Sequence, residues 1–178
     1  MKVKYLVLVL FFSIKLCYAQ KSTIEKSGDI LQITLPILAF SSTLIWTDDS
    51  KPFLQFVKTM GTSVIITHGL KRIINKTRPN GGNYSFPSGH TSSAFTGAAF
   101  IQKRYGWKFG VPAYIIASYV GWTRIYANKH DTWDVIGGGI IGICSAYLFV
   151  KPFKNRDINL ALLEVNKKEV LVGITYKF

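Results

Sequence analysis

The chain has 178 residues, of which 48% are hydrophobic and 17% are charged, and its formal net charge is +13. This length suits one domain with a core of its own, and the apolar, charge-poor composition favours contact with a membrane. The two cysteines exclude a disulfide framework and a zinc site of the usual spacing. The positive charge indicates an anionic partner, such as nucleic acid, anionic lipid or a phosphorylated substrate.

The N-terminus has the layout of a secretory signal. Two lysines precede an apolar run over residues 5–14, and small residues stand before Gln20. We therefore predict a signal over residues 1–19, with cleavage after Ala19. The alternative is an uncleaved first membrane helix, for which the apolar run is short.

Five apolar segments follow the signal, and their length and their content of Ala, Leu and Ile favour helices. They span residues 28–46, 53–75, 90–103, 109–126 and 131–150. Pro36 is expected to kink the first of them, and the fourth would also suit a strand. Alternating apolar residues near the C-terminus predict a short β-hairpin. The predicted fold class is all-α: a bundle of about five helices after the signal, six if the signal remains, with that hairpin at the end.

The predicted domains are one helical unit over residues 20–155 and a tail over residues 156–178. Two architectures suit the helices: a membrane-spanning bundle, and a soluble or surface-bound domain in the periplasm. The positive stretch at 103–108 favours the first, because such loops stay in the cytoplasm. Residues 76–90 and 124–131 would then meet on the opposite, external side.

Basic residues and histidines gather in and beside these two external loops. Lys71 and Arg78 are seven residues apart, which on one helix would point both the same way. His130 and Asp134 are four residues apart and share a helix face, although such a pair taken alone is more often a surface contact. His90 follows a Pro-Ser-Gly turn at the start of a predicted helix.

A helix start of this kind offers free N–H groups and a partial positive charge to an oxyanion. Ser88 and Gly89 supply such donors next to His90. The fixed cations nearby are Lys71, Arg78 and Arg124. Together these groups suit a phosphate. They do not suit a metal ion, because the sequence shows no carboxylate cluster, so we predict neither a metal nor a cofactor.

Three motifs in this order resemble the signature of the type 2 phosphatidic acid phosphatase (PAP2) family, which shares its pocket with bacterial class A acid phosphatases and vanadium haloperoxidases. That signature is Lys, six residues, Arg-Pro; then Pro-Ser-Gly-His; then Ser-Arg, five residues, His. The chain reads KRIINKTRP at 71–79, PSGH at 87–90 and TRIYANKH at 123–130. Thr123 replaces the usual Ser but keeps a hydroxyl. The helix pattern extends the resemblance over residues 50–150.

The resemblance implies a role for each motif residue. His130 would attack phosphorus and form a phosphohistidine, while Asp134 would hold its other ring nitrogen. Asp131 is the alternative for that second role, or a helix cap. His90 would protonate the leaving oxygen and then activate water. The phosphoryl oxygens would be held by Lys71, Arg78, Ser88, the Gly89 N–H and Arg124, with Thr123 as a further candidate.

The expected function is that of a metal-independent phosphatase of phosphomonoesters or pyrophosphates, with a lipid substrate and no nucleic acid as partner. It is expected in a bacterial inner membrane with the site facing the periplasm. The alternatives are a soluble periplasmic acid phosphatase of broad specificity and a lipid phosphotransferase. A haloperoxidase is disfavoured by the short chain, and a non-catalytic anion binder by the intact His90 and His130. The oligomeric state stays open. His68, outside the motifs, is expected to be a buried polar residue.

Overall fold

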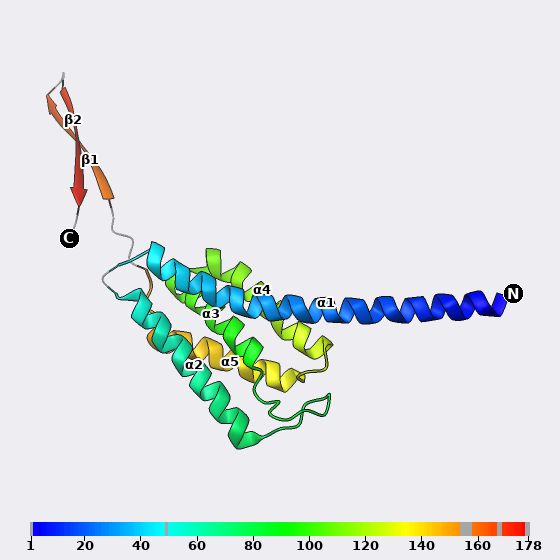
Figure 1. Ribbon diagram of the computed structural model, residues 1–178. Helices are drawn as coiled ribbons and strands as arrows, with labels where there is room; N and C mark the ends of the chain where they lie inside the picture. The colour runs from blue at the N-terminus through cyan, green and yellow to red at the C-terminus, as the bar shows by residue number, and fades with distance from the viewer. Residues whose placement is uncertain (1, 49, 154–157, 167–168, 177–178) are drawn as a thin grey trace.

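Five helices form the body of the protein in the computed structural model. The structure describes residues 2–48, 50–153, 158–166 and 169–176, and it describes side chains over residues 21–48 and 50–153. The helices are α1 (Lys2–Ile45), α2 (Pro52–Ile74), α3 (Gly89–Tyr105), α4 (Trp107–Tyr126) and α5 (Thr132–Phe149). The predicted all-α bundle is confirmed (Figure 1), and the fourth segment is a helix rather than a strand.

Helix α3 lies at the centre of the bundle and packs against the other four helices. Its buried positions hold mostly Ala, Ser, Thr and Gly, and small side chains of this kind let helix backbones approach closely. Gly142 of α5 shows how close the approach is. A Cβ at this position would lie 2.7 Å from the backbone nitrogen of Thr96 and 2.8 Å from the backbone oxygen of Ser92. The contact between α3 and α5 therefore depends on the missing side chain.

The bundle places polar side chains inside and apolar side chains outside. The buried face of α2 carries Gln55, Thr59, Ser63 and Thr67 at four-residue spacing. On the same helix Ile65 is 73% exposed and Ile73 is 80% exposed. This distribution of polar and apolar side chains is the reverse of that on a helix at the surface of a soluble protein. It suits a bilayer, where the outer face of a helix needs no polar groups.

In the part of the chain that the structure describes, two helices are long and apolar enough to cross a membrane by length and composition. They are α1 over Lys21–Ile45 and α5 over Thr132–Phe149. Together with the outward-facing apolar side chains of α2, they are the features of a membrane protein.

Helix α1 is continuous from Lys2 to Ile45, whereas two separate apolar segments were expected in this region. The stretch between them contains neither Gly nor Pro, so nothing in it stops the helix. Signal cleavage after Ala19 stays a prediction. Pro36 lies inside α1 and has no N–H to donate to the carbonyl of Gln32. That carbonyl accepts a hydrogen bond of 3.1 Å from Ser93 Oγ instead, which ties α1 to α3.

The α2–α3 loop and the α4–α5 turn meet at one end of the bundle, as expected (Figure 1). The backbone N–H of Ser88 donates to the backbone oxygen of Asp134 over 2.9 Å. The expectation that Lys71 and Arg78 share one helix face is wrong. Helix α2 ends at Ile74, because Asn75 takes the left-handed conformation with φ of 43°, so Arg78 belongs to the loop.

Beyond the bundle, β1 (Ile158–Asn166) and β2 (Glu169–Tyr176) form an antiparallel pair in which Ile158 faces Tyr176. The predicted boundary between domain and tail falls within residues 154–157, outside the described residues. The division of the chain at this point stays a prediction.

We expect Gly142→Ala to lower the melting temperature of the detergent-solubilised protein. The new Cβ would overlap backbone atoms of α3, and overpacking of this kind costs roughly 1–3 kcal/mol. Gly61→Ala in α2 is the matched control, because a Cβ there meets nothing within 4 Å. It should be neutral or stabilising, by up to about 1 kcal/mol. Equal melting temperatures for the two variants would contradict the close contact.

Candidate active site

His130 lies in the α4–α5 turn and is held through one ring nitrogen. Its Nδ1 is 3.3 Å from Asp134 Oδ2 and 3.4 Å from Ser85 Oγ. Because a carboxylate only accepts hydrogen bonds, this contact favours the tautomer with the proton on Nδ1. The lone pair of Nε2 is then free for chemistry. The His130 side chain is 4% exposed and that of Asp134 is 0% exposed, so the pair is shielded from water.

Asp131 and Asp134 divide two tasks that the sequence left open. They form a reciprocal capping box at the start of α5, in which Asp131 Oδ1 accepts from the Asp134 N–H and Asp134 Oδ2 from the Asp131 N–H, each over 3.0 Å. Of the two carboxylates, Asp134 is the one hydrogen-bonded to His130. Lys76 Nζ donates to Asp134 Oδ1 over 2.9 Å and also binds Asp131. The geometry thus places Asp134 beside the ring and Asp131 at the helix cap.

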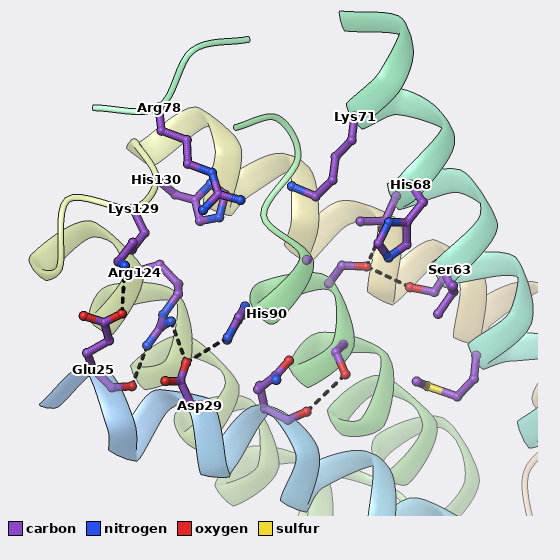
Figure 2. Close-up of a pocket in the computed structure, with 17 residues that line it drawn as sticks. Glu25, Asp29, Ser63, His68, Lys71, Arg78, His90, Arg124, Lys129 and His130 are labelled. Carbon is purple, nitrogen blue, oxygen red and sulfur yellow. Dashed lines mark hydrogen bonds and ion pairs between the residues drawn. The ribbon is translucent and has the colours of Figure 1, made fainter. Parts of the chain in front are cut away.

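Two cations stand over the His130 ring. Lys71 Nζ, at the end of α2, donates to the backbone oxygen of Tyr84 over 2.8 Å. Arg78 comes from the loop, and its Nε is buried with no hydrogen-bond partner among the described residues. A buried donor without a partner is costly, and an anion in the site would satisfy it. Figure 2 shows Arg78 close to His130, with Lys71 facing both from α2.

This setting decides the charge of His130. Burial, and then the positive charges of Lys71 and Arg78, lower its pKa from 6.5 to about 4, although Asp134 acts in the opposite direction. The ring is therefore neutral at pH 7, which leaves the lone pair of Nε2 unprotonated.

The PSGH motif forms the start of α3. Ser88 is the N-cap, and its Oγ accepts from the Thr91 N–H at 3.4 Å and from Thr91 Oγ1 at 2.9 Å. The Ser88 side chain is fully buried and does not line the cavity described below, so it supports the helix start from behind. Gly89 and His90, the first two residues of α3, face the cavity.

The third motif positions Arg124 in the same way. Thr123 is fully buried, its Oγ1 donates to the Val120 backbone oxygen over 2.7 Å, and it accepts from Arg124 Nε over 3.2 Å. Arg124 NH1 reaches Asp29 of α1 at 2.8 Å. Thr123 thus fixes the Arg124 guanidinium rather than facing the cavity. A Ser at this position would offer a hydroxyl for the same two hydrogen bonds.

A cavity of about 480 Å³ joins these groups. The motif residues that line it are Lys71, Arg78, Gly89, His90, Arg124 and His130. Figure 2 shows the five of them that are labelled there, Lys71, Arg78, His90, Arg124 and His130, converging from α2, α3, α4 and the loops. Earlier on α2, the cavity wall includes Met60 and Val64, and on α1 it includes Gln32. Six of the predicted site residues are therefore brought together, while Ser88, Thr123 and Asp134 lie behind them.

Several residues of the site were not anticipated from the sequence. They are Glu25 and Asp29 of α1, Ser85 of the α2–α3 loop, and Lys129. The signal for Asp29 was a lone acid in an apolar segment, whereas Ser85 carried no signal at all. His68 is exposed and lines the cavity, so the expectation that it is buried is wrong.

We expect the His130 ring to titrate near pH 4 in nitrogen-15 NMR spectra of the protein in detergent. Replacing Arg78 by Gln removes one positive neighbour and should move this titration to higher pH, towards 6.5. Lys108→Gln, at the first turn of α4 and outside the cavity lining, is the charge-matched control and should leave the titration unchanged. A His130 titration near 6.5 in the unsubstituted protein would contradict the site as described.

Comparison with known proteins agrees with this geometry. A model of the PAP2 superfamily matches residues 80–158, which include the second and third motifs. A lipid A 4'-phosphatase of Helicobacter pylori is 31% identical over 145 residues, covering 75% of this chain and 72% of the relative. A lipid A 1-phosphatase of Helicobacter pylori is 27% identical over 134 residues, covering 70% and 66%.

Two solved structures share the fold. The crystal structure of Aquifex aeolicus LpxE gives a TM-score of 0.60 at 23% identity, covering 75% of this chain and 84% of that one. A transmembrane PAP2-type phosphatidylglycerolphosphate phosphatase from Bacillus subtilis gives 0.57 at 24% identity, covering 74% and 73%. From the three motifs, the cavity that they line and the 31% identity to a lipid A phosphatase, we conclude that the chain belongs to the PAP2 superfamily and is a phosphatase of that family.

Proposed function

We propose that the protein hydrolyses lipid phosphates or pyrophosphates through a phosphohistidine on His130, on the periplasmic side of a bacterial inner membrane. The observation that carries the proposal is the arrangement of His130. Its Nδ1 lies against the buried Asp134 carboxylate, and the cavity in front of the ring is lined by Lys71, Arg78 and Arg124.

In the first step, His130 Nε2 attacks phosphorus and the bond from phosphorus to the leaving oxygen breaks. The lysine and the two arginines stabilise the charge that develops on the phosphoryl oxygens, and the N–H groups at the start of α3 add to this field. His90 gives a proton to the leaving oxygen. Asp134 stabilises the His130 ring as it becomes positively charged.

In the second step, a water molecule attacks the phosphorus of the phosphohistidine. His90, now neutral, takes a proton from the water as the new bond from oxygen to phosphorus forms. The bond between phosphorus and Nε2 breaks, and both histidines return to their starting states with inorganic phosphate as product.

The shape of the cavity supports a lipid substrate. It extends from Lys71 to Met60, which lies 11 residues earlier on α2 and therefore about 16 Å along the helix axis. The outer surface of the same helix is apolar, so a substrate held in a bilayer would reach the site without leaving the membrane. The relatives act on lipids as well, namely lipid A and, in a Bacillus subtilis protein that is 28% identical over 98 residues, undecaprenyl diphosphate.

The chain order supports a periplasmic site. Cleavage after Ala19 would leave Gln20 on the outer side of the membrane, five residues before Glu25, which lines the cavity. Lys103 and Lys108 flank the turn between α3 and α4, at the other end of α3 from the site, where the positive-inside rule expects cytoplasm.

We expect the purified protein to release phosphate from lipid A, phosphatidylglycerol phosphate or undecaprenyl diphosphate in the presence of EDTA. His130→Ala should abolish the release, because no nucleophile remains, and acid-labile labelling of the protein by phosphorus-32 substrate should disappear with it. Release that continues unchanged in His130→Ala, or wild-type protein inactive on the whole panel, would refute the proposal.

A matched pair of variants tests the role of Asp134. Asp134→Asn should lower kcat by roughly 10²-fold or more, because it no longer fixes the His130 tautomer. Asp131→Asn alters the same capping box but does not touch His130, so it should cost only a few-fold. If the two variants lose activity equally, the capping box rather than the carboxylate–imidazole contact is what matters.

Orientation can be tested with single cysteines in a background that lacks Cys17 and Cys144. An impermeant thiol reagent should label Asn80→Cys in the α2–α3 loop of intact cells, and should label Lys108→Cys only after lysis. The reverse pattern would place the site in the cytoplasm.

A further inference from the structure

Helix α1 contributes an acidic residue to the site, outside the three motifs. Asp29 Oδ1 lies 2.8 Å from His90 Nε2 and 2.8 Å from Arg124 NH1, so one oxygen joins the second motif to the third. In Figure 2, Asp29 lies on one side of His90, and Arg78 with His130 lies on the other. This carboxylate therefore stands beside the residue assigned as the proton donor.

The neighbouring residues show that α1 is built to dock at this point. Gly28 is buried against α4, and a Cβ there would lie 2.1 Å from Thr123 Oγ1 and 2.8 Å from Arg124 NH2. The backbone oxygen of Glu25 accepts from Arg124 NH2 over 2.6 Å, and the Glu25 carboxylate pairs with Lys129 at 3.1 Å. Helix α1 thus approaches the third motif too closely for any residue but glycine at position 28.

We propose that Asp29 is a positioning residue for the general acid His90, and this inference rests on the proposed function. The Asp29 carboxylate accepts a hydrogen bond from the N–H at Nε2 of His90 and so leaves the other ring nitrogen, Nδ1, for the cavity. The same carboxylate stabilises the doubly protonated ring, whose Nδ1 proton passes to the leaving oxygen as the bond from phosphorus to that oxygen breaks. In the second step Nδ1 takes a proton from water.

The charges around His90 explain why such a residue is needed. Burial, and then the positive charges of Arg124 of α4 and Arg78 of the α2–α3 loop, lower the pKa of His90 below its usual value of 6.5. Other titratable groups that line the same cavity are Glu25 of α1, Lys71 and His68 of α2, Lys129 and His130. Most of these charges are positive and oppose a second proton on His90, whereas the adjacent Asp29 carboxylate acts in the opposite direction.

The test compares two substrates that differ in their need for a proton donor. Cleavage of a short-chain phosphatidate expels an alkoxide, which must be protonated, whereas 4-nitrophenyl phosphate expels a stable phenolate. Asp29→Asn should lower kcat on the phosphatidate by roughly 10²-fold and on 4-nitrophenyl phosphate by less than about threefold. The alkaline limb of the phosphatidate pH profile should move to lower pH, because the acid loses its proton more easily. Asp29→Glu should restore part of the activity.

Three controls separate this role from others. His90→Ala should show the same difference between the substrates, and adding Asp29→Asn to it should change the ratio no further. Glu25→Gln, one turn earlier on α1 and paired with Lys129, should affect both substrates equally. Melting temperatures check that each variant is folded.

An equal loss on both substrates in Asp29→Asn would overturn the inference, because Asp29 would then only hold Arg124 for phosphate binding. A gain on both would also overturn it, because Asp29 would then compete with the phosphate. If the unsubstituted protein cleaves neither these two substrates nor any lipid of the panel named above, or if His130→Ala cleaves them as well as the unsubstituted protein does, the proposed function itself has failed.

Discussion

The site depends on one buried carboxylate, that of Asp134. It accepts hydrogen bonds from Lys76, Ser85 and the Asp131 backbone, and it lies against the His130 ring. The backbone oxygen of the same residue accepts from Ser88, so the starts of α3 and α5 are fixed to each other. A fully buried charge persists only when it is well paired, and the partners that satisfy Asp134 are also the segments that form the site.

The bundle that holds this polar site apart from water is built from small residues. Helix α3 packs against four neighbours through Ala, Ser, Thr and Gly, and Ile and Val side chains of α2 face outward. Because burial of large apolar side chains contributes little inside such a bundle, close backbone packing and interhelical hydrogen bonds stabilise it, as in other membrane helices. One such hydrogen bond runs from Ser93 Oγ to the backbone oxygen of Gln32, which Pro36 leaves without an intrahelical donor.

The two histidines of the cavity, His130 and His90, have different charged neighbours. Around His130, burial and then the positive charges of Lys71 and Arg78 lower the pKa of the ring to about 4, although Asp134 acts in the opposite direction. Around His90, burial and the positive charges of Arg124 and Arg78 lower the pKa of the ring, and the carboxylate of Asp29 acts in the opposite direction. The two histidines of the cavity thus both lie in positive surroundings, but each has its own carboxylate partner, Asp134 for His130 and Asp29 for His90.

The sequence by itself determined which residues make up the three motifs and the approximate place of each in the fold. Motif spacing identified His130, His90 and the cations, and apolar segments bounded by polar loops predicted the helices, because these signals are local in the chain. Only the tertiary structure decided that Ser88 and Thr123 act from behind the cavity, that Arg78 leaves the helix, and that Asp29 joins the site. These features depend on which backbones approach each other, as at Gly28, and no local pattern records a contact between residues nearly a hundred positions apart.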